Sequence, residues 1–280
     1  MLIVLASAGG SPGVTTTALA LALHWLRPVV LVEADASGRS GLLAGFFRGQ
    51  LDQPGLVDLV LAQRSDLLRE AVPRLLFPLE GSAASVLFGL RSHEQAGGAA
   101  ALWGPLLEVL RSLDPAGTDV IVDAGQLGVN GWPKALVAGA DVMLVATRSD
   151  LPGLAGARSW AAALAADQVP GHTVRLVLIG EGRPYSDREA AKTLGLPVLA
   201  SVDWSPEHAA VYSHGRSVPA VPLWRRVGRG PDADRDAFED SAYIRSIRAV
   251  AGAIESAIQP PIPTPLQTVL AGAIERKSPA

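Results

Sequence analysis

The sequence predicts an α/β protein with a mostly parallel, twisted β-sheet flanked by helices on both faces. Short apolar segments alternate along the chain with longer segments of helical composition, an order typical of βαβ units. Hydrophobic residues make up 49% of the 280 residues and aromatic residues only 5%. The apolar content is therefore mostly Ala, Leu and Val, which suits helices packed on a buried sheet. This length is sufficient for one large domain.

The individual elements follow from the spacing of apolar, Gly and Pro residues. Short, often β-branched runs predict strands at residues 2–6, 29–32, 85–90, 119–123, 141–147, 174–179 and 197–202. Longer runs predict helices at residues 15–26, 99–113, 154–166, 187–194 and 241–258. Residues 224–240 carry mixed charge with Gly and Pro, so we expect a solvated loop there. Residues 1–258 then form a single domain.

The chain continues beyond this domain. Residues 259–265 (QPPIPTP) predict a stiff, Pro-rich linker. Residues 266–280 predict a short amphipathic tail, because its apolar residues recur at helical spacing. They are Leu266, Val269, Leu270, Ala273 and Ile274. Only Arg276 and Lys277 are basic, so docking onto a partner or onto the domain is favoured over membrane contact.

Composition excludes several classes of chemistry. The chain has no Cys, which excludes disulfides, Cys-ligated zinc, Fe–S clusters and a thiol nucleophile. Its five His residues lack metal-ligand spacing, so we expect no zinc site. The net charge of −3 argues against strong non-specific DNA binding. We expect a cytoplasmic protein, with contact at the inner face of the cell membrane as the less favoured alternative.

The strongest local motif is a Gly-rich turn between the first strand and the first helix. Such a turn lets the backbone approach an anion, and the helix N-terminus directs N–H groups towards it. We expect phosphate to be bound by Gly9, Gly10, Ser11, Pro12, Gly13, Val14, Thr15 and Thr16. The match to the P-loop pattern G-x-x-x-x-G-K-[ST] is imperfect, because Ala8 replaces the first Gly and Val14 replaces the Lys.

Two other interpretations of this turn remain open. The same residues fit a degenerate dinucleotide fingerprint, Ala8-x-Gly10-x-x-Gly13, with Glu33 twenty residues after Gly13 as a ribose-binding acid. An NAD(P)-binding Rossmann oxidoreductase would also need a catalytic set, and Tyr185 and Lys192 do not have Tyr-x-x-x-Lys spacing. The turn could also be an ordinary βα connection that binds nothing.

Acidic residues at the ends of two later strands favour the phosphate-binding interpretation. Glu33 and Asp35 follow the second strand, and Asp123 closes the strand at 119–123. An acid that ends an apolar strand is a Walker B arrangement, in which the carboxylate orients Mg²⁺ or its water. We therefore expect Thr15 and Asp123 to hold Mg²⁺, whereas a nicotinamide site needs neither the second acid nor the Thr cluster.

Several ordered segments resemble the ParA/MinD group of P-loop ATPases, the deviant Walker A branch. SAGGSPGVTTTALALAL resembles that group's KGGxGKTTxxxxLA, VVLVEADASG its DxDPQ-type segment and TDVIVDAG its Walker B strand. ADVMLVATRSDLPGLAGAR and DREAAKTLGLPVLASVDWSPEHAAVYSHGRSV resemble its later stretches. The resemblance covers roughly residues 1–258 and extends equally to the TadZ/CpaE-type pilus localisation ATPases, whose loop is often degenerate.

The resemblance implies roles for individual residues. The family's two loop lysines align with Val14 and Gly9, so both are missing. Glu33 and Asp35 align with the switch acids that act on the attacking water, and they are the candidate catalytic residues. Gly180 replaces an Asn that often recognises the base. Trp204 lies near the base pocket, where a structural role is favoured over an adenine contact, and Arg39 or Arg48 could supply a cation.

The resemblance further implies a nucleotide-binding switch that positions cellular cargo such as the chromosome, the division septum or secretion/pilus machinery. We expect weak binding of ATP and Mg²⁺, a homodimer, and a protein partner from a positioning or secretion system. ATP hydrolysis is expected to be weak or lost, because phosphoryl transfer depends on positive groups that stabilise the transition state. The alternative is a catalytically dead pseudo-ATPase scaffold that binds protein partners.

Overall fold

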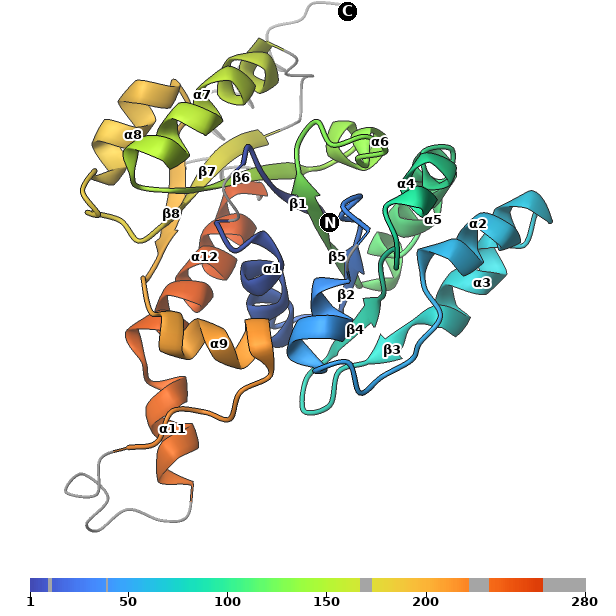
Figure 1. Cartoon of the computed structure of the whole chain (residues 1–280), viewed down its shortest axis with the longest axis horizontal. Coiled ribbons are helices and arrows are strands. Elements are labelled where there is room, and N and C mark those ends of the chain that lie inside the picture. Colours follow the sequence, from blue (N-terminus) through green and yellow to red (C-terminus); the bar gives the residue numbers. More distant parts are fainter. Residues whose placement is uncertain (10–11, 39, 167–172, 222–231, 259–280) are drawn as a thin grey trace, which may run out of the picture.

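A twisted parallel sheet forms the centre of the computed structural model, which describes residues 1–9, 12–38, 40–166, 173–221 and 232–258 (Figure 1). Within the described residues the sheet has eight strands in the order β3-β4-β2-β5-β1-β6-β7-β8. All neighbours pair in parallel except β3 and β4. The strands are β1 (Leu2–Ser7), β2 (Val29–Glu33), β3 (Phe77–Pro78), β4 (Ala84–Leu87), β5 (Asp119–Gln126), β6 (Val142–Arg148), β7 (Thr173–Ile179) and β8 (Val198–Val202). The predicted single α/β domain is confirmed.

Helices cover both faces of this sheet. On one face lie α2 (Leu56–Arg64), α3 (Leu68–Leu75), α4 (Glu94–Ala99), α5 (Trp103–Arg111), α6 (Lys134–Ala138), α7 (Leu151–Ala166) and α8 (Asp187–Leu194). On the other lie α1 (Val14–Leu23), α9 (Pro206–His214), α11 (Ala233–Glu239) and α12 (Ala242–Ile258). A π-helical turn, η1 (Leu42–Phe46), and a 3₁₀ turn, η2 (Asp114–Ala116), complete the described elements. None of the described helices combines the length and apolar character needed to cross a membrane.

The pleat of β1 explains why the core has two halves. Leu2, Val4 and Ala6 point into the apolar cluster on one face, and Ile3 and Leu5 point into the cluster on the other. Successive strand side chains alternate between faces, and here both faces are covered. The strand therefore carries a continuous apolar sequence, and its polar chemistry is confined to the ends.

Three of the sequence expectations need correction. The helix expected at 99–113 begins only at Trp103, and the first helix ends at Leu23 rather than at residue 26. The loop expected at 224–240 was wrong for Ala233–Glu239, which forms α11. Phe238 is the reason, because its buried ring packs against Tyr212 of α9. Residues 224–231, the predicted linker 259–265 and the predicted tail 266–280 lie outside the described residues.

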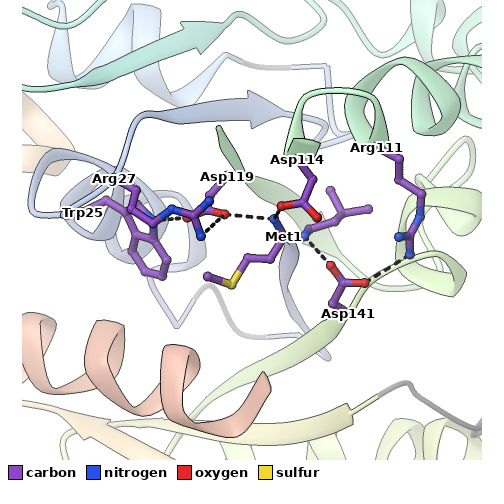
Figure 2. Close-up of polar contacts among 8 residues, drawn as sticks. Met1, Trp25, Arg27, Arg111, Asp114, Asp119 and Asp141 are labelled. Carbon is purple, nitrogen blue, oxygen red and sulfur yellow. Dashed lines mark hydrogen bonds and ion pairs between the residues drawn. The ribbon is translucent and has the colours of Figure 1, made fainter. Parts of the chain in front are cut away.

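Polar contacts join the strands at the amino edge of the sheet (Figure 2). The carboxylate of Asp119, at the start of β5, is fully buried and accepts a hydrogen bond from Trp25 Nε1 at 2.9 Å. It also pairs with the Met1 amine at 2.9 Å and with Arg27 at 3.4 Å. Asp141 similarly accepts a hydrogen bond from the first backbone N–H of β1 at 2.7 Å. The acidic side chains at the amino edge thus form hydrogen bonds and ion pairs that join the strands. The candidate site lies at the opposite, carboxyl edge of the sheet.

Candidate functional site

The candidate site begins where β1 turns into α1. Gly13 precedes the helix in the left-handed conformation (φ 98°, ψ 35°) and has no side chain that could cap it. The first N–H groups of a helix need partners from outside the helix, and together with the helix dipole they favour an anion. Gly10 and Ser11 of the predicted phosphate loop lie outside the described residues. The described part of the turn thus has the local structure expected of a phosphate-binding loop.

A hollow of about 330 Å³ opens at this turn. Its described lining comes from the loop, from the segment after β2 and from the end of β5. The lining residues are Ser7, Pro12, Gly13, Val14, Thr15, Thr16, Asp35, Ser37, Gly125, Gln126 and Val129. The topology therefore brings Asp35 to the predicted loop. None of these lining residues is a Lys, Arg or His, and Arg48 is not among them; Arg39 lies outside the described part of the chain.

Asp123 contacts Gly125, which lines this hollow, and is paired in register with Glu33 on β2. Its Oδ1 accepts a hydrogen bond from the Gly125 backbone N–H at 3.0 Å, whereas its buried Oδ2 has no hydrogen-bond partner among the described residues. Burial raises the pKa of the Asp123 carboxyl to about 7, and the nearby carboxylates of Asp35 and Glu33 act in the same direction. The nearby side chain of Thr15 acts in the opposite direction and lowers this pKa.

These two side chains fit a magnesium ion by their chemistry. Mg²⁺ prefers oxygen ligands and is usually held by one or two carboxylates together with waters and substrate phosphates. A buried carboxylate oxygen without a partner, next to a Thr hydroxyl, supplies two such oxygens. The described residues contain no cluster of three or more His, Asp or Glu side chains that could hold a metal alone. Water or phosphate would have to supply the remaining ligands.

Glu33 has a different environment from the other acids. Its Oε2 accepts hydrogen bonds from Ser40 Oγ at 2.6 Å and from the Gly89 N–H at 2.9 Å. Its Oε1 accepts one from the Leu42 N–H at 3.0 Å. The side chain is 1% exposed, and burial raises its pKa while these hydrogen bonds oppose the rise. Both oxygens are therefore bound to the protein, and Glu33 does not line the hollow.

Asp35 is the candidate catalytic acid that lines the hollow. Its Oδ1 accepts a hydrogen bond from the Ser37 N–H at 2.8 Å. Its carboxyl group lies against the backbone of Gly125, where φ is +61° and an added Cβ would collide with the Asp35 side chain. Only glycine satisfies both conditions at this position. The close approach places Asp35 directly beside the turn that follows Asp123.

A second hollow, of about 210 Å³, adjoins the first and shares Pro12, Gly13 and Thr16 with it. Its other lining residues are mainly apolar or aromatic and come from α1, from the ends of β7 and β8 and the segment that follows β8, and from α9 and α12. They are Thr17, Ile179, Val202, Asp203, Trp204, Ser205, Pro206, Ala209 and Tyr243. An apolar hollow beside a phosphate-binding turn has the character of a site for a flat organic group.

Trp204 forms one wall of this second hollow. The guanidinium carbon of Arg148 lies 4.7 Å from the centroid of the Trp204 ring, and that of Arg183 lies 6.0 Å away. Both distances are within the range of cation–π contacts. Gly180 makes room for this group, because a Cβ there would lie 3.2 Å from the Trp204 Cβ. The position that resembles the family's base-recognising Asn is thus next to an aromatic ring fixed by two arginines.

Sequence reasoning missed several of these residues. Ser40 and Gly89 carry no motif, because their role arises from long-range contacts to Glu33. Gln126 could have been noted, because it lies three residues after Asp123. The strand was expected to end at Asp123, but β5 continues to Gln126. Arg148 could have been noted for a similar reason, because it is a charge at the carboxyl end of a core strand.

A parallel sheet with a Gly-rich loop, an uncapped helix after its central strand and a buried acid on the neighbouring strand defines a P-loop nucleotide-binding fold. Solved structures agree. The septum site-determining protein MinD of Pyrococcus horikoshii OT3, complexed with Mg-ADP, superposes with a TM-score of 0.65 at 16% identity over 90% of this chain and 95% of that chain. A ParA family ATPase from Chlorobium tepidum TLS gives a TM-score of 0.64 at 14% identity, covering 90% of this chain and 97% of that chain.

A chain of the MinC:MinD cell division protein complex of Aquifex aeolicus gives a TM-score of 0.62 at 13% identity, covering 93% of this chain and 98% of that one. The chain therefore has the ParA/MinD-like ATPase fold over the length of its described domain. No protein-family model and no curated protein matches the sequence. At these identities the fold is shared, and the roles of individual residues remain predictions.

Proposed function

We propose that this protein is a ParA/MinD-like nucleotide switch that positions a cellular cargo and hydrolyses ATP weakly or not at all. The observation that carries the proposal is the pair of adjoining hollows at the loop after β1. One is polar, lies at an uncapped helix N-terminus and is lined by Gly125, which contacts Asp123; the other is apolar and aromatic. This pairing suits a nucleotide, whose phosphates and base need opposite environments.

Within this proposal the loop Gly9–Thr16 binds the phosphates through backbone N–H groups, and Thr15 and Asp123 hold Mg²⁺. The ion would neutralise phosphate charge and orient the phosphates. Asp35 is the better placed of the two candidate catalytic acids, because it lines the hollow. Glu33 positions the segment at residues 40–42 instead, since its oxygens already accept hydrogen bonds from Ser40, Leu42 and Gly89.

The same hydrogen bonds argue against the nicotinamide alternative. A ribose-binding acid must offer its carboxylate to the 2′-hydroxyl. Glu33, which that interpretation requires, is 1% exposed and has both oxygens bound to the protein. NADH is therefore expected not to bind, and it serves as a negative control for ATP.

Weak hydrolysis follows from the composition of the hollow. Catalysis of phosphoryl transfer relies mainly on positive groups that stabilise spreading negative charge. Val14 and Gly9 replace the two lysines that the resembling family carries in this loop. The described lining of the hollow holds no other cation. The same lack of cationic side chains in the described lining supports the second candidate function, a pseudo-ATPase scaffold that binds protein partners.

The proposed partners are inferred by analogy with proteins that share the fold. MinD of Aquifex aeolicus was solved in a complex with MinC. By analogy we propose a homodimer that binds a protein of a chromosome, septum or secretion/pilus positioning system in the cytoplasm. The tail at 266–280 would dock onto a partner or onto the domain, with contact to the inner membrane face as the less favoured alternative. The net charge of −3 argues against strong non-specific DNA binding.

Calorimetric titration of the purified chain with Mg²⁺-ATP at millimolar concentrations tests the proposal. Saturable binding that is lost in Asp123→Asn and absent with NADH is the expected result. A matched pair of assays, ATP hydrolysis and dimerisation with and without nucleotide, then separates the switch from the scaffold. A folded protein that binds no nucleotide would reject the switch and leave the scaffold.

A further inference from the structure

The described wall of the polar hollow carries only negative formal charge. Asp35 lies in the wall and Asp123 contacts the wall residue Gly125, whereas no lining residue is a Lys, Arg or His. Gly10 and Ser11, which complete the loop in sequence, are uncharged residues as well. A nucleoside triphosphate would meet these carboxylates with only the backbone N–H groups and the helix dipole to offset the repulsion, because no lining side chain is cationic.

Asp123 supplies a separate observation that points to a cation. Its Oδ2 is buried and has no hydrogen-bond partner among the described residues, although Oδ1 is bound by the Gly125 N–H at 3.0 Å. A buried polar atom without a partner is costly and calls for an explanation such as a bound ion or water. The Thr15 side chain lines the same hollow as Gly125 and would provide a second oxygen.

Mutual repulsion among the carboxylates supports the same conclusion. Glu33 is paired with Asp123 in register on the neighbouring strand, and the Asp35 carboxyl group lies against the backbone of Gly125, two residues after Asp123. Like charges disfavour ionisation, and a cation placed among them reverses that effect. In a loop with the usual Lys, an ammonium group supplies this charge. Here Val14 lines the hollow and contributes only methyl groups.

We infer that this chain binds a divalent cation at Asp123 and Thr15 before any nucleotide is present, and that this cation takes over the role of the missing loop lysine. Nucleotide then binds to the cation-loaded protein. The second half of this inference rests on the proposed nucleotide function, whereas cation binding to the free protein does not. With only two protein oxygens assigned, the ion keeps several waters, as Mg²⁺ commonly does.

Manganese(II) is a suitable probe because its free form is read directly by electron paramagnetic resonance. The full chain is freed of nucleotide and treated with a chelator, which is then removed. Titration with Mn²⁺ is expected to give saturable binding at one site per chain, displaced by excess Mg²⁺. Asp123→Asn, which keeps the shape of the side chain and removes its charge, is expected to abolish this site.

Two substitutions at Val14 distinguish the effect of a positive charge in the hollow from the effect of a longer side chain. Val14→Lys puts the missing ammonium into the hollow and is expected to abolish Mn²⁺ binding to the free protein. Val14→Met adds length without charge and is expected to retain it. Circular dichroism and thermal melting identify any variant that fails to fold, and Asp123→Asn keeps the inference testable if Val14→Lys is one of them.

Arg39 needs its own variant, because it is a cation two residues after Ser37, which lines the hollow, and lies outside the described residues. Arg39→Ala is expected to leave the Mn²⁺ affinity unchanged. Much tighter binding in Arg39→Ala would show that Arg39 already supplies the positive charge, and it would overturn the inference. Binding that persists in Asp123→Asn, or no saturable binding at all, would also overturn it.

A nucleotide titration in parallel distinguishes this inference from the proposed function. Calorimetry with ATP is done once with Mg²⁺ and once with chelator. Binding with Mg²⁺ but no Mn²⁺ site on the free protein would leave the switch and reject cation-first binding. A Mn²⁺ site without any nucleotide binding would support cation binding and reject the switch. Equal ATP affinity with and without a divalent cation would reject the claim that the ion replaces the lysine.

Discussion

Ser40 Oγ donates a hydrogen bond of 2.6 Å to Oε2 of Glu33, and this contact joins the end of β2 to the segment that follows it. The N–H groups of Leu42 and Gly89 bind the same carboxylate. Hydrogen bonds to an ionised acceptor are stronger than neutral ones, and a carboxylate only accepts. Glu33 therefore acts as an anchor for residues 40–42, next to the proposed nucleotide site.

Glu33→Gln should destabilise the protein, because its amide nitrogen is a donor and would replace one of the two oxygens, where it would face either the Leu42 N–H or the donors of Ser40 and Gly89. Loss of satisfied bonds at a buried site costs about 1–3 kcal/mol. Ser40→Ala removes one donor only and should cost about 1 kcal/mol. Urea unfolding monitored by circular dichroism measures both effects. If Glu33 instead positioned water, Glu33→Gln would lower ATPase activity and leave the free energy of unfolding nearly unchanged.

Gly125→Ala should lower the free energy of unfolding by more than the strain of a positive φ alone would. A Cβ at Gly125 would collide with the Asp35 carboxyl group, and φ there is +61°. Gly117 is a matched control, because its φ is +80° and a Cβ there would meet no atom within 4 Å. Each substitution carries a backbone cost of roughly 1 kcal/mol. We expect the collision to add to this cost at Gly125 only, as measured by the difference in unfolding free energy.

Loss of nucleotide affinity should accompany Gly125→Ala, since the collision displaces Asp35 from the hollow. Gly117→Ala lies at the far end of β5 and should leave affinity unchanged. Calorimetry with Mg²⁺-ATP compares the two variants. Equal affinities would show that the contact between Gly125 and Asp35 does not contribute to the site.

Much of the fold could be predicted from the sequence, because a buried parallel sheet produces apolar runs that are easy to recognise. The strand at 119–123 is an example: both of its faces are covered, so its residues are apolar between two acids. Strand β3 has only two residues, and α11 is anchored mainly by Phe238, so neither produces a periodic pattern. Such short elements are determined by tertiary contacts rather than by local sequence.

The candidate site was predictable only where residues belong to the loop or end a strand. The loop after β1, Asp35 and Asp123 meet at the carboxyl edge because neighbouring parallel strands end there. Sequence could not distinguish Glu33 from Asp35, which are two residues apart. Their difference depends on hydrogen bonds to Ser40 and Gly89, and Gly89 is 56 residues away from Glu33.

Trp204→Ala should weaken nucleotide binding, and Trp204→Phe should largely preserve it. The ring lines the apolar hollow and is held by Arg148 and Arg183, so it is fixed before any ligand arrives. Stacking of a base on an aromatic side chain contributes about 1–3 kcal/mol, or roughly one to two orders of magnitude in affinity. Titration with Mg²⁺-ATP measures this. Equal affinity in Trp204→Ala would place the base elsewhere.

The stability of the metal-free protein should depend on pH through Asp123. Burial raises the pKa of its carboxyl from 3.8 to about 7. Below pH 3.8 the group is protonated in the folded and unfolded states and carries no penalty. Between pH 3.8 and about 7 the unfolded chain loses the proton first, so the free energy of unfolding falls as pH rises. Above pH 7 the full penalty, roughly 4 kcal/mol, is present.

Asp123→Asn isolates this contribution because Asn does not titrate. In the presence of EDTA, the parent should lose stability relative to Asp123→Asn as pH rises from 5 to about 7, and the difference should level off above about 8. The other titrating groups are common to both proteins, so their effects cancel to first order. Urea unfolding at several pH values measures the difference. A difference that does not change with pH would show that Asp123 is ionised throughout, as an acid with an ordinary pKa would be.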